Sequence, residues 1–243
     1  MTIFSYLLHQ SEMIILSLFT LMISVLLSSI FVPIFRKFAL AKDIIAVPSI
    51  RRSHTNKIPV LGGVSIYFVL FFTILIISQY LILIIETERF IQLYYFGFAS
   101  SILFSVGLID DVYGLKPRIK LFFQLLASYV LICITDNLII DSMYGLFGIF
   151  KLHPIISCPL TIFIFIVFVN MLNLIDGIDG LASGISIVAL AFFGIISFLS
   201  NNNVSLILSI AGLGSLLPFF YYNVYSVKKI FLGDNGSLLL GSI

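Results

Sequence analysis

The sequence predicts an all-α polytopic membrane protein with seven spans and part of an eighth. Sixty per cent of its 243 residues are apolar, only 10% are charged and the mean hydropathy is +1.20. Soluble globular proteins carry about 25% charged residues, so this composition indicates an integral membrane protein. No charged region, repeat or low-complexity tract divides the sequence, and we expect one membrane-embedded domain over residues 1–243.

Apolar stretches of about 20 residues predict the spans, because a helix of that length crosses a hydrocarbon core of about 30 Å. The expected spans, of which the fourth is shorter, are Met13–Phe35, Leu61–Ile85, Ile91–Ile109, Ile119–Thr135, Ile155–Leu172, Leu181–Leu199 and Val204–Tyr222. An eighth begins near Asn235 and has nine residues up to and including Ile243, so we expect the domain to be incomplete at its C-terminus. Between the fourth and fifth spans, Asp136–Pro154 carries glycines among aromatic residues and is expected to form a small hairpin.

The basic residues predict the orientation. If the spans alternate direction, eleven Lys and Arg residues lie on one side and only Arg89 and Lys151 on the other. The positive-inside rule then places the first set in the cytoplasm and the N-terminus outside. The basic residues follow this topology rather than forming a patch, so we expect no nucleic-acid partner.

Polar clusters gather on the predicted cytoplasmic side. The first runs from Pro48 to Gly63 and contains Arg52 and His54, which could hold an anionic substrate or be ordinary positive-inside charges. The second is Asp110-Asp111 at the end of the third span, followed by Lys120. Two adjacent carboxylates repel each other unless a cation offsets them, and Lys120 could do so or reach a phosphate. The alternative is that the acids only cap the span.

The third cluster follows the uncharged run Ile155–Leu172 and contains Asn173, Asp176 and Asp179 at steps of three. Carboxylates this close to hydrocarbon cost about 2.5–3.5 kcal/mol each on insertion scales and normally mark a functional site. Gly177 and Gly180 are expected to end the helix and let the carboxylates turn toward one centre. This pattern favours an oxygen-ligand or sugar-binding set over a structural role.

The fourth cluster is Phe231–Ser237, with Asp234 at the expected start of a helix. Backbone N–H groups at a helix start favour anions, and Asp234 could hold Mg²⁺ against a diphosphate or simply cap the helix. Mg²⁺ commonly takes one or two carboxylates plus substrate phosphates. We therefore expect the carboxylates of these clusters to converge on one cleft at the cytoplasmic face.

Taken in order, four stretches resemble the polyprenyl-phosphate N-acetylhexosamine-1-phosphate transferases. They are Pro48–Gly63, Asp110–Gln124, Asn170–Gly184 and Phe231–Gly241. The resemblance implies a multi-pass enzyme of the bacterial cytoplasmic membrane that moves a sugar-1-phosphate from a UDP-sugar to undecaprenyl phosphate, releases UMP and uses Mg²⁺ or Mn²⁺. Such enzymes start the lipid carriers of O-antigen, teichoic acid and peptidoglycan. A homodimer is left open.

The resemblance also implies roles for individual residues. Asp234 would be the main Mg²⁺ ligand, with Asn173 beside it. Asp110 and Asp111 would deprotonate or orient the lipid phosphate, and Lys120 would contact phosphate. The residues implied to bind the nucleotide-sugar are Asp176, Asp179, Phe231, which would pack on uracil, and Asn223. The stretch Asn223–Phe231 departs from the family pattern, because it carries Ser226–Lys229 where family members tend to have a Pro-Ala or Gly-Lys turn and is one residue longer.

Two other hypotheses remain. An ion-coupled transporter would also carry membrane acids, but it predicts carboxylates at mid-span and matching halves with broken helices. In this sequence the acids lie at span ends on one side, and no internal repeat is visible. The second hypothesis is an inactive, truncated remnant of the transferase, because the final span is so short.

Overall fold

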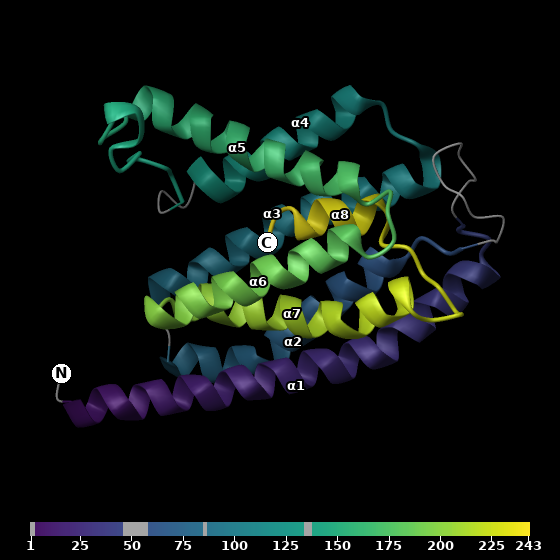
Figure 1. The fold of residues 1–243 in the computed structure, drawn as a ribbon, viewed down its shortest axis with the longest axis horizontal. Coiled ribbons are helices and arrows are strands. Elements are labelled where there is room, and N and C mark those ends of the chain that lie inside the picture. The colour runs from purple at the N-terminus through teal and green to yellow at the C-terminus, as the bar shows by residue number, and fades with distance from the viewer. Residues whose placement is uncertain (1–2, 46–57, 85–86, 134–137) are drawn as a thin grey trace.

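The chain forms a bundle of helices that run along one long axis (Figure 1). A computed structural model describes residues 3–45, 58–84, 87–133 and 138–243. The helices are α1 (Ile3–Ala41), α2 (Gly62–Ile84), α3 (Thr87–Tyr113), α4 (Pro117–Ser128), α5 (Pro154–Ile175), α6 (Leu181–Leu199), α7 (Asn203–Val224) and α8 (Gly233–Leu240), with a π-helical continuation of α4, η1 (Tyr129–Cys133), and a 3-10 turn, η2 (Leu146–Gly148). The described residues contain no strand, only the isolated bridges Ile45–Pro59 and Ser142–Lys151. The all-α prediction is therefore confirmed for this part of the chain.

Six of the described helices are long and apolar enough to cross a membrane. They are α1, α2, α3, α5, α6 and α7. The predicted span Ile119–Thr135 corresponds to the 12-residue α4 and the five residues of η1, which together fall short of that length. Seven spans therefore remain a prediction, while a multi-pass membrane protein is what the helices indicate.

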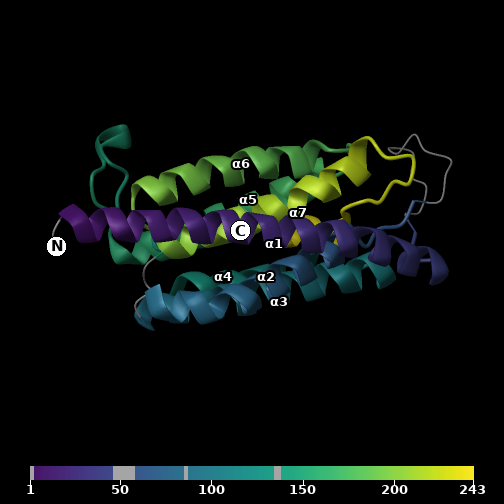
Figure 2. The ribbon, with the colours of Figure 1, turned by 90° about the horizontal axis from the view of Figure 1, so that it is seen from below.

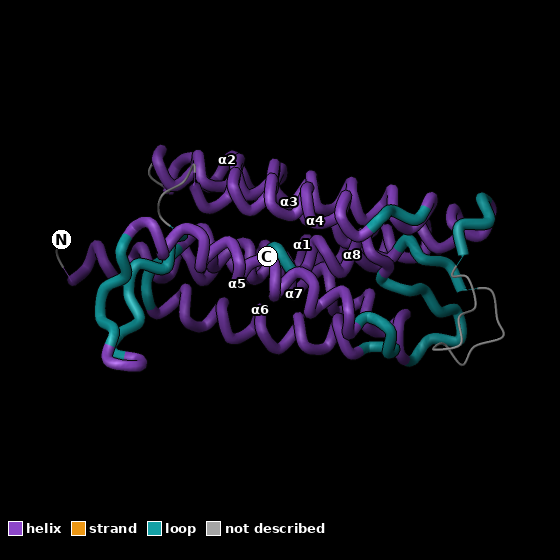
Figure 3. Tube along the Cα trace, turned by 90° about the horizontal axis from the view of Figure 1, so that it is seen from above, coloured by secondary structure: helices purple, strands orange, loops and turns teal. Residues whose placement is uncertain are grey.

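The helices form two layers with α8 between them. Figures 2 and 3, seen from opposite sides, show α2, α3 and α4 in one layer and α5, α6 and α7 in the other. Helix α1 lies along one edge and packs against α2 and α7. The short α8 contacts α2, α3 and α5. Helix α8 therefore packs against helices of both layers.

Helix α8 fits this position because small residues line its contacts. A Cβ on Gly107 of α3 would lie 2.5 Å from the Asn235 Cα, and one on Gly241 would lie 2.6 Å from the Val169 Cα of α5. A Cβ on Gly63 of α2 would overlap the Asn235 side chain and the Gly236 backbone. Small residues let helix backbones approach closely in membranes. Seven of the eight residues of α8 are buried as a result.

Substituting Gly63 with alanine is expected to destabilise the fold. The added methyl group would meet backbone atoms of α8, which cannot move without shifting Asp234, and overpacking of this kind costs about 1–3 kcal/mol. Gly97→Ala in α3 is the matched control, because a Cβ there has no atom within 4 Å. We expect thermal unfolding in detergent to show a lower Tm for Gly63→Ala and an unchanged or higher Tm for Gly97→Ala. Equal values would contradict close packing of α8.

Within the described residues, the predicted cytoplasmic segments lie at one end of the bundle, the right-hand end in Figure 1, where α1, α3, α5 and α7 end and α2, α4, α6 and α8 begin. The opposite end carries the N-terminus, the α6–α7 turn and the segment before α5. The clustering of these segments is thus observed. Which end faces the cytoplasm remains the prediction made from the basic residues.

Single-cysteine labelling tests the orientation. Ser200 lies at the C-cap of α6 and Val227 between α7 and α8, and both side chains are exposed. On a background lacking Cys133 and Cys158, we expect Ser200→Cys to react with an impermeant maleimide in intact cells. Val227→Cys should react only after the membrane is opened. The reverse pattern would invert the topology.

Candidate active site

One lysine joins the ends of three helices at this end of the bundle. The Lys120 Nζ, in the first turns of α4, forms ion pairs with Asp110 at the end of α3 and with Asp234 at the start of α8. The distance to the Asp234 Oδ2 is 2.6 Å. The three side chains are between 12 and 29% exposed, so the cluster is partly shielded yet reachable. Lys120 thus offsets Asp110, as expected, but its second partner is Asp234 rather than Asp111.

A hydrogen bond from a nearby backbone N–H group also holds the Asp110 carboxylate in place. Its Oδ1 accepts a hydrogen bond of 2.6 Å from the Leu115 backbone N–H, just before α4. The chain turns between these helices at Gly114, whose φ of +71° suits glycine. The carboxylate therefore holds the α3–α4 connection with one oxygen and Lys120 with the other.

Asp111 faces a different partner, the first turn of α8. Its Oδ1 accepts from the Asp234 N–H at 2.9 Å, and its Oδ2 accepts from the Asn235 N–H at 3.0 Å and from the Asn235 Nδ2 at 2.5 Å. The Asn235 Nδ2 also donates to the Val60 carbonyl, just before α2, at 3.2 Å. A carboxylate from another helix thus satisfies N–H groups that the start of a helix leaves without intrahelical partners. This arrangement gives Asp111 a positioning role: it sets where Asp234 points.

The segment before α8 is tied to the start of α2. Phe231 donates its N–H to the Pro59 carbonyl and accepts from the Gly62 N–H, at 2.8 and 2.9 Å. Gly233 follows with a φ of +78°, and a Cβ there would lie 2.8 Å from the Asp111 Oδ2. Only glycine fits both the conformation and the space. The half-buried Phe231 side chain is thereby held at the same end of the bundle as Asp234.

Two amide side chains of α5 join it to α4 and α8, the helices that carry Lys120 and Asp234. The side chains of Asn170 and Gln124 exchange reciprocal hydrogen bonds of 2.8 and 3.2 Å, which join α5 to α4. One turn later, the Asn173 Nδ2 donates to the Ser237 Oγ at 2.9 Å, and Ser237 lies one turn after Asp234 in α8. Asn173 is therefore within one helical turn of Asp234. Asp176 is the half-exposed C-cap of α5.

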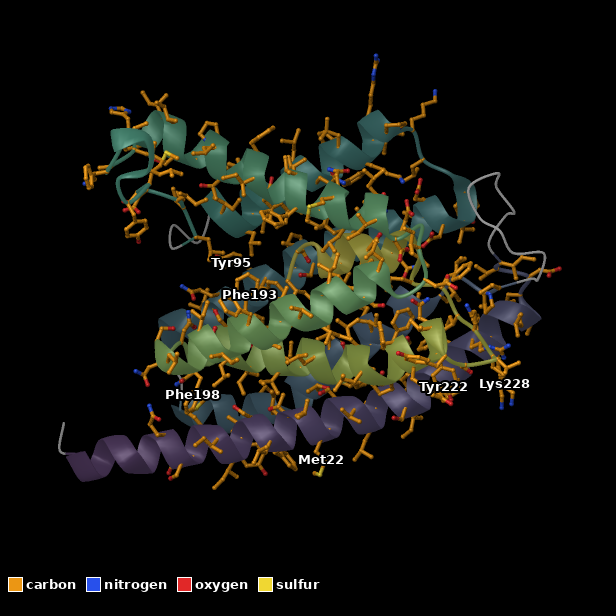
Figure 4. All side chains as sticks on the ribbon, in the orientation of Figure 1. Met22, Tyr95, Phe193, Phe198, Tyr222 and Lys228 are labelled. Atoms are coloured by element: carbon orange, nitrogen blue, oxygen red, sulfur yellow. The ribbon has the colours of Figure 1, made fainter. Side chains whose placement is uncertain are left out.

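Asp179 belongs to a second charged contact. Its Oδ2 pairs with the Lys229 Nζ at 2.5 Å, across the loops α5–α6 and α7–α8. The same two loops are joined by Asn223, whose Oδ1 accepts from the Gly180 N–H at 2.7 Å and whose Nδ2 donates to the Ile230 carbonyl at 3.0 Å. Figure 4 shows the neighbouring Lys228 pointing away from the bundle. Lys229 therefore differs from Lys228 in having an acidic partner.

The structure brings most of the predicted residues to one end of the bundle, in two linked groups. In the first group, Asp110, Lys120 and Asp234 are in direct contact, and Asp111 and Asn173 bind α8. In the second group, Asp179 and Asn223 hold the loop that leads to Phe231. Arg52 and His54 lie outside the described residues. Sequence reasoning assigned no role of their own to Asn235, Ser237 and Lys229. Asn235 could have been suspected from its place beside Asp234, whereas the Lys229 partner emerges only from the tertiary structure.

Asp234 and Asp110 are the residues best placed to hold a metal ion. Burial raises the pKa of the Asp234 carboxyl and the nearby Asp110 raises it further, while Lys120 opposes the shift. A cation beside Asp234 would offset both unfavourable contributions. Within the described residues, no three His, Cys, Asp or Glu side chains group as a complete metal site. Two carboxylates nonetheless fit Mg²⁺ where substrate phosphates complete its coordination.

Comparison with known proteins gives the family. The sequence profile described as glycosyl transferase family 4 matches residues 93–243. The chain belongs to glycosyl transferase family 4. The matched region contains every ion-paired and hydrogen-bonding side chain described at this end. Only the backbone groups of Pro59, Val60 and Gly62 lie outside it.

Three bacterial proteins illustrate the similarity of this family 4 chain to its relatives. It is 30% identical to a probable undecaprenyl-phosphate N-acetylglucosaminyl 1-phosphate transferase of Bacillus subtilis, over 90% of the chain and 58% of the relative. It is 32% identical to an undecaprenyl-phosphate alpha-N-acetylglucosaminyl 1-phosphate transferase of Haemophilus influenzae, over 80% of the chain and 53% of the relative. A phospho-N-acetylmuramoyl-pentapeptide-transferase of Clostridium botulinum is 33% identical over 90% of the chain and 67% of the relative. The chain thus spans little more than half of the first two relatives.

Proposed function

We propose that this chain provides the catalytic end of a phosphoglycosyl transferase of the bacterial cytoplasmic membrane. The reaction moves an N-acetylhexosamine-1-phosphate from a UDP-sugar to undecaprenyl phosphate and releases UMP, as the first membrane step of a cell-envelope polysaccharide. The observation that carries the proposal is the Lys120 ammonium shared by Asp110 and Asp234 in a family 4 chain. The relatives' names supply undecaprenyl phosphate and the N-acetylglucosaminyl 1-phosphate group. The UDP-sugar donor comes from the family resemblance of the sequence.

The chemistry needs positive charge more than a strong base. An oxygen of the lipid phosphate forms a bond to the sugar-bearing phosphorus, and the bond from that phosphorus to the UMP oxygen breaks. Both reactants are anions, so catalysis consists mainly of alignment and charge neutralisation. Lys120 supplies one positive charge at the cluster, and Asp110 and Asp234 hold its ammonium in place.

Mg²⁺, or Mn²⁺ in its place, would be held by Asp234 with Asp110 or Asn173 and would add positive charge on the diphosphate. Asp111 acts on the reaction by orienting Asp234 through the first turn of α8. The nucleotide-sugar is assigned to Asp176, Asp179, Asn223 and Phe231, with Arg52 and His54 as further anion-binding candidates. Placing both charged substrates at this end also requires it to face the cytoplasm, where UDP-sugars are made.

A transfer assay tests the proposal. We expect the purified chain in nanodiscs, given undecaprenyl phosphate, Mg²⁺ and a panel of UDP-N-acetylhexosamines, to release UMP and form a lipid-linked sugar diphosphate visible by mass spectrometry. A chain that is stabilised by UDP-sugar and Mg²⁺ without turnover would favour the inactive remnant. Cation transport by the chain in liposomes, without any UMP release, would favour the ion-coupled transporter and overturn the proposal.

A further inference from the structure

The segment of residues 138–153, at the end of the bundle opposite to the candidate site, forms a compact hairpin before α5. Ser142 and Lys151 form an antiparallel bridge, and the Met143 N–H donates to the Phe150 carbonyl at 3.2 Å. The chain reverses through Gly145 and η2, with Gly145 at a φ of +88°. At its base, the Ile140 N–H donates to the Thr161 Oγ1 of α5 at 3.0 Å. The hairpin is thus an ordered element tied to a membrane span.

The tip of this 138–153 hairpin is unusually apolar for an exposed turn. Residues 143–150 contain no charged side chain, while Asp141 and Lys151 stand on either side of the tip. Tyr144 is 91% exposed, Phe150 71% and Leu146 58%. Three large exposed side chains on one short turn form a patch of the kind that marks an interaction site rather than scattered surface residues.

The direction of the hairpin indicates its partner. Figures 2 and 3 show it running across the long axis of the bundle at this end and reaching past α6, instead of continuing along the axis. The membrane-spanning helices set that axis close to the bilayer normal, so the hairpin runs parallel to the membrane surface. Its tip therefore lies beyond α6, at the periphery of the part of the chain that the structure describes.

The apolar tip is also continuous with the lipid-facing surface. Ile155 and Ile156, in the first turn of α5 next to the base of the hairpin, are 77 and 55% exposed. Tyrosine and other aromatic side chains are enriched where a membrane protein meets the headgroup region, because their rings are apolar and the hydroxyl is polar. Lys151 at the base can reach lipid phosphates while its stem lies along the apolar tip.

We propose that the 138–153 hairpin is an interfacial anchor, with the tip side chains Tyr144, Leu146 and Phe150 inserted into the headgroup–acyl boundary of the leaflet opposite to the candidate site. The partner is the lipid bilayer itself. The anchor fixes the depth of α4 and α5, whose other ends carry Lys120 and Asn173. This inference is independent of the transferase reaction.

The sequence offers a clean test, because it contains no tryptophan. Phe150→Trp and, separately, Tyr144→Trp would each place a single fluorophore at the tip, and the second position is too exposed to disturb packing. Phe163→Trp, exposed near the middle of α5, reports the acyl region, and Val227→Trp, fully exposed at the other end, reports water. Each variant is placed at one chain per nanodisc, in phosphatidylcholine brominated either near the headgroup or near the chain end.

We expect both tip variants to emit at shorter wavelength than Val227→Trp and to be quenched more by the shallow bromines than by the deep ones. Phe163→Trp should show the opposite order of quenching. Water-like emission without quenching at both tip positions would overturn the anchor. A shift to shorter wavelength without quenching by either lipid would also overturn it, since the tip would then contact protein.

Discussion

Asp234→Asn is expected to lower UMP release by at least about a hundredfold without unfolding the protein. The amide keeps the size of the side chain and leaves the backbone hydrogen bond to Asp111 intact. It removes the charge that pairs with Lys120 and that would hold the metal ion. Loss of one preorganised electrostatic group in an active site typically costs 100- to 1,000-fold, as an order of magnitude. Turnover is measured as UMP formed in nanodiscs with undecaprenyl phosphate and the preferred UDP-sugar.

A second measurement separates lost metal binding from lost folding. Mg²⁺ or Mn²⁺ should raise the Tm of the unsubstituted chain, because a ligand that binds only the folded state stabilises it. Asp234→Asn should have a similar Tm without metal and little response to it. Asp141→Asn, the same chemical change at the exposed base of the 138–153 hairpin, is the control and should keep both turnover and the metal response. Full activity in Asp234→Asn would show that the metal and lysine act elsewhere.

Asp111→Ala should have the largest effect on stability. The substitution leaves the N–H groups of Asp234 and Asn235 and the Asn235 amide without their acceptor. Each partly buried donor left unpaired costs about 1–3 kcal/mol, and together they would loosen the start of α8. We expect a marked fall in Tm and a loss of turnover.

Asp111→Asn discriminates between positioning and proton transfer. Its amide oxygen can still accept from one N–H group, so we expect a Tm between those of Asp111→Ala and the unsubstituted chain, with partial activity. Asn235→Ala should also lower activity, because Asp111 then loses its link to Val60. If Asp111→Asn had the full Tm but no turnover, Asp111 would act as a catalytic base and not as a positioning residue.

The sequence was sufficient for the class of fold and for the end of the bundle where the polar residues gather. The bilayer imposes the same span length and the same preference for loop charge along the whole chain. A predicted span such as Leu181–Leu199 therefore matches the observed helix closely. The structure of the span expected from Ile119 to Thr135 was harder to predict. Helix α4 changes to a π-helix at Tyr129, and hydropathy carries no signal for that change.

The pairing of the site residues could be predicted only in part. Offsetting of Asp110 by Lys120 followed from charge alone, because they lie close in sequence. The distinct roles of Asp110 and Asp111 did not, since neighbouring helical residues point about 100° apart and only the docking of α8 shows which faces which helix. The Asp179–Lys229 pair joins residues 50 apart in sequence through two loops, a contact set entirely by tertiary packing.

A double-mutant cycle on Lys120 and Asp234 tests most directly whether these side chains form one catalytic unit. UMP release is measured for Lys120→Met, Asp234→Asn and the double variant, with Lys228→Met as the control for an exposed lysine that points away from the bundle. Groups that act as a unit have non-additive effects. We predict that the double variant is no slower than the slower single variant. The shared site would be contradicted if the double variant lost activity by the product of the two single losses. It would also be contradicted if both single variants retained turnover.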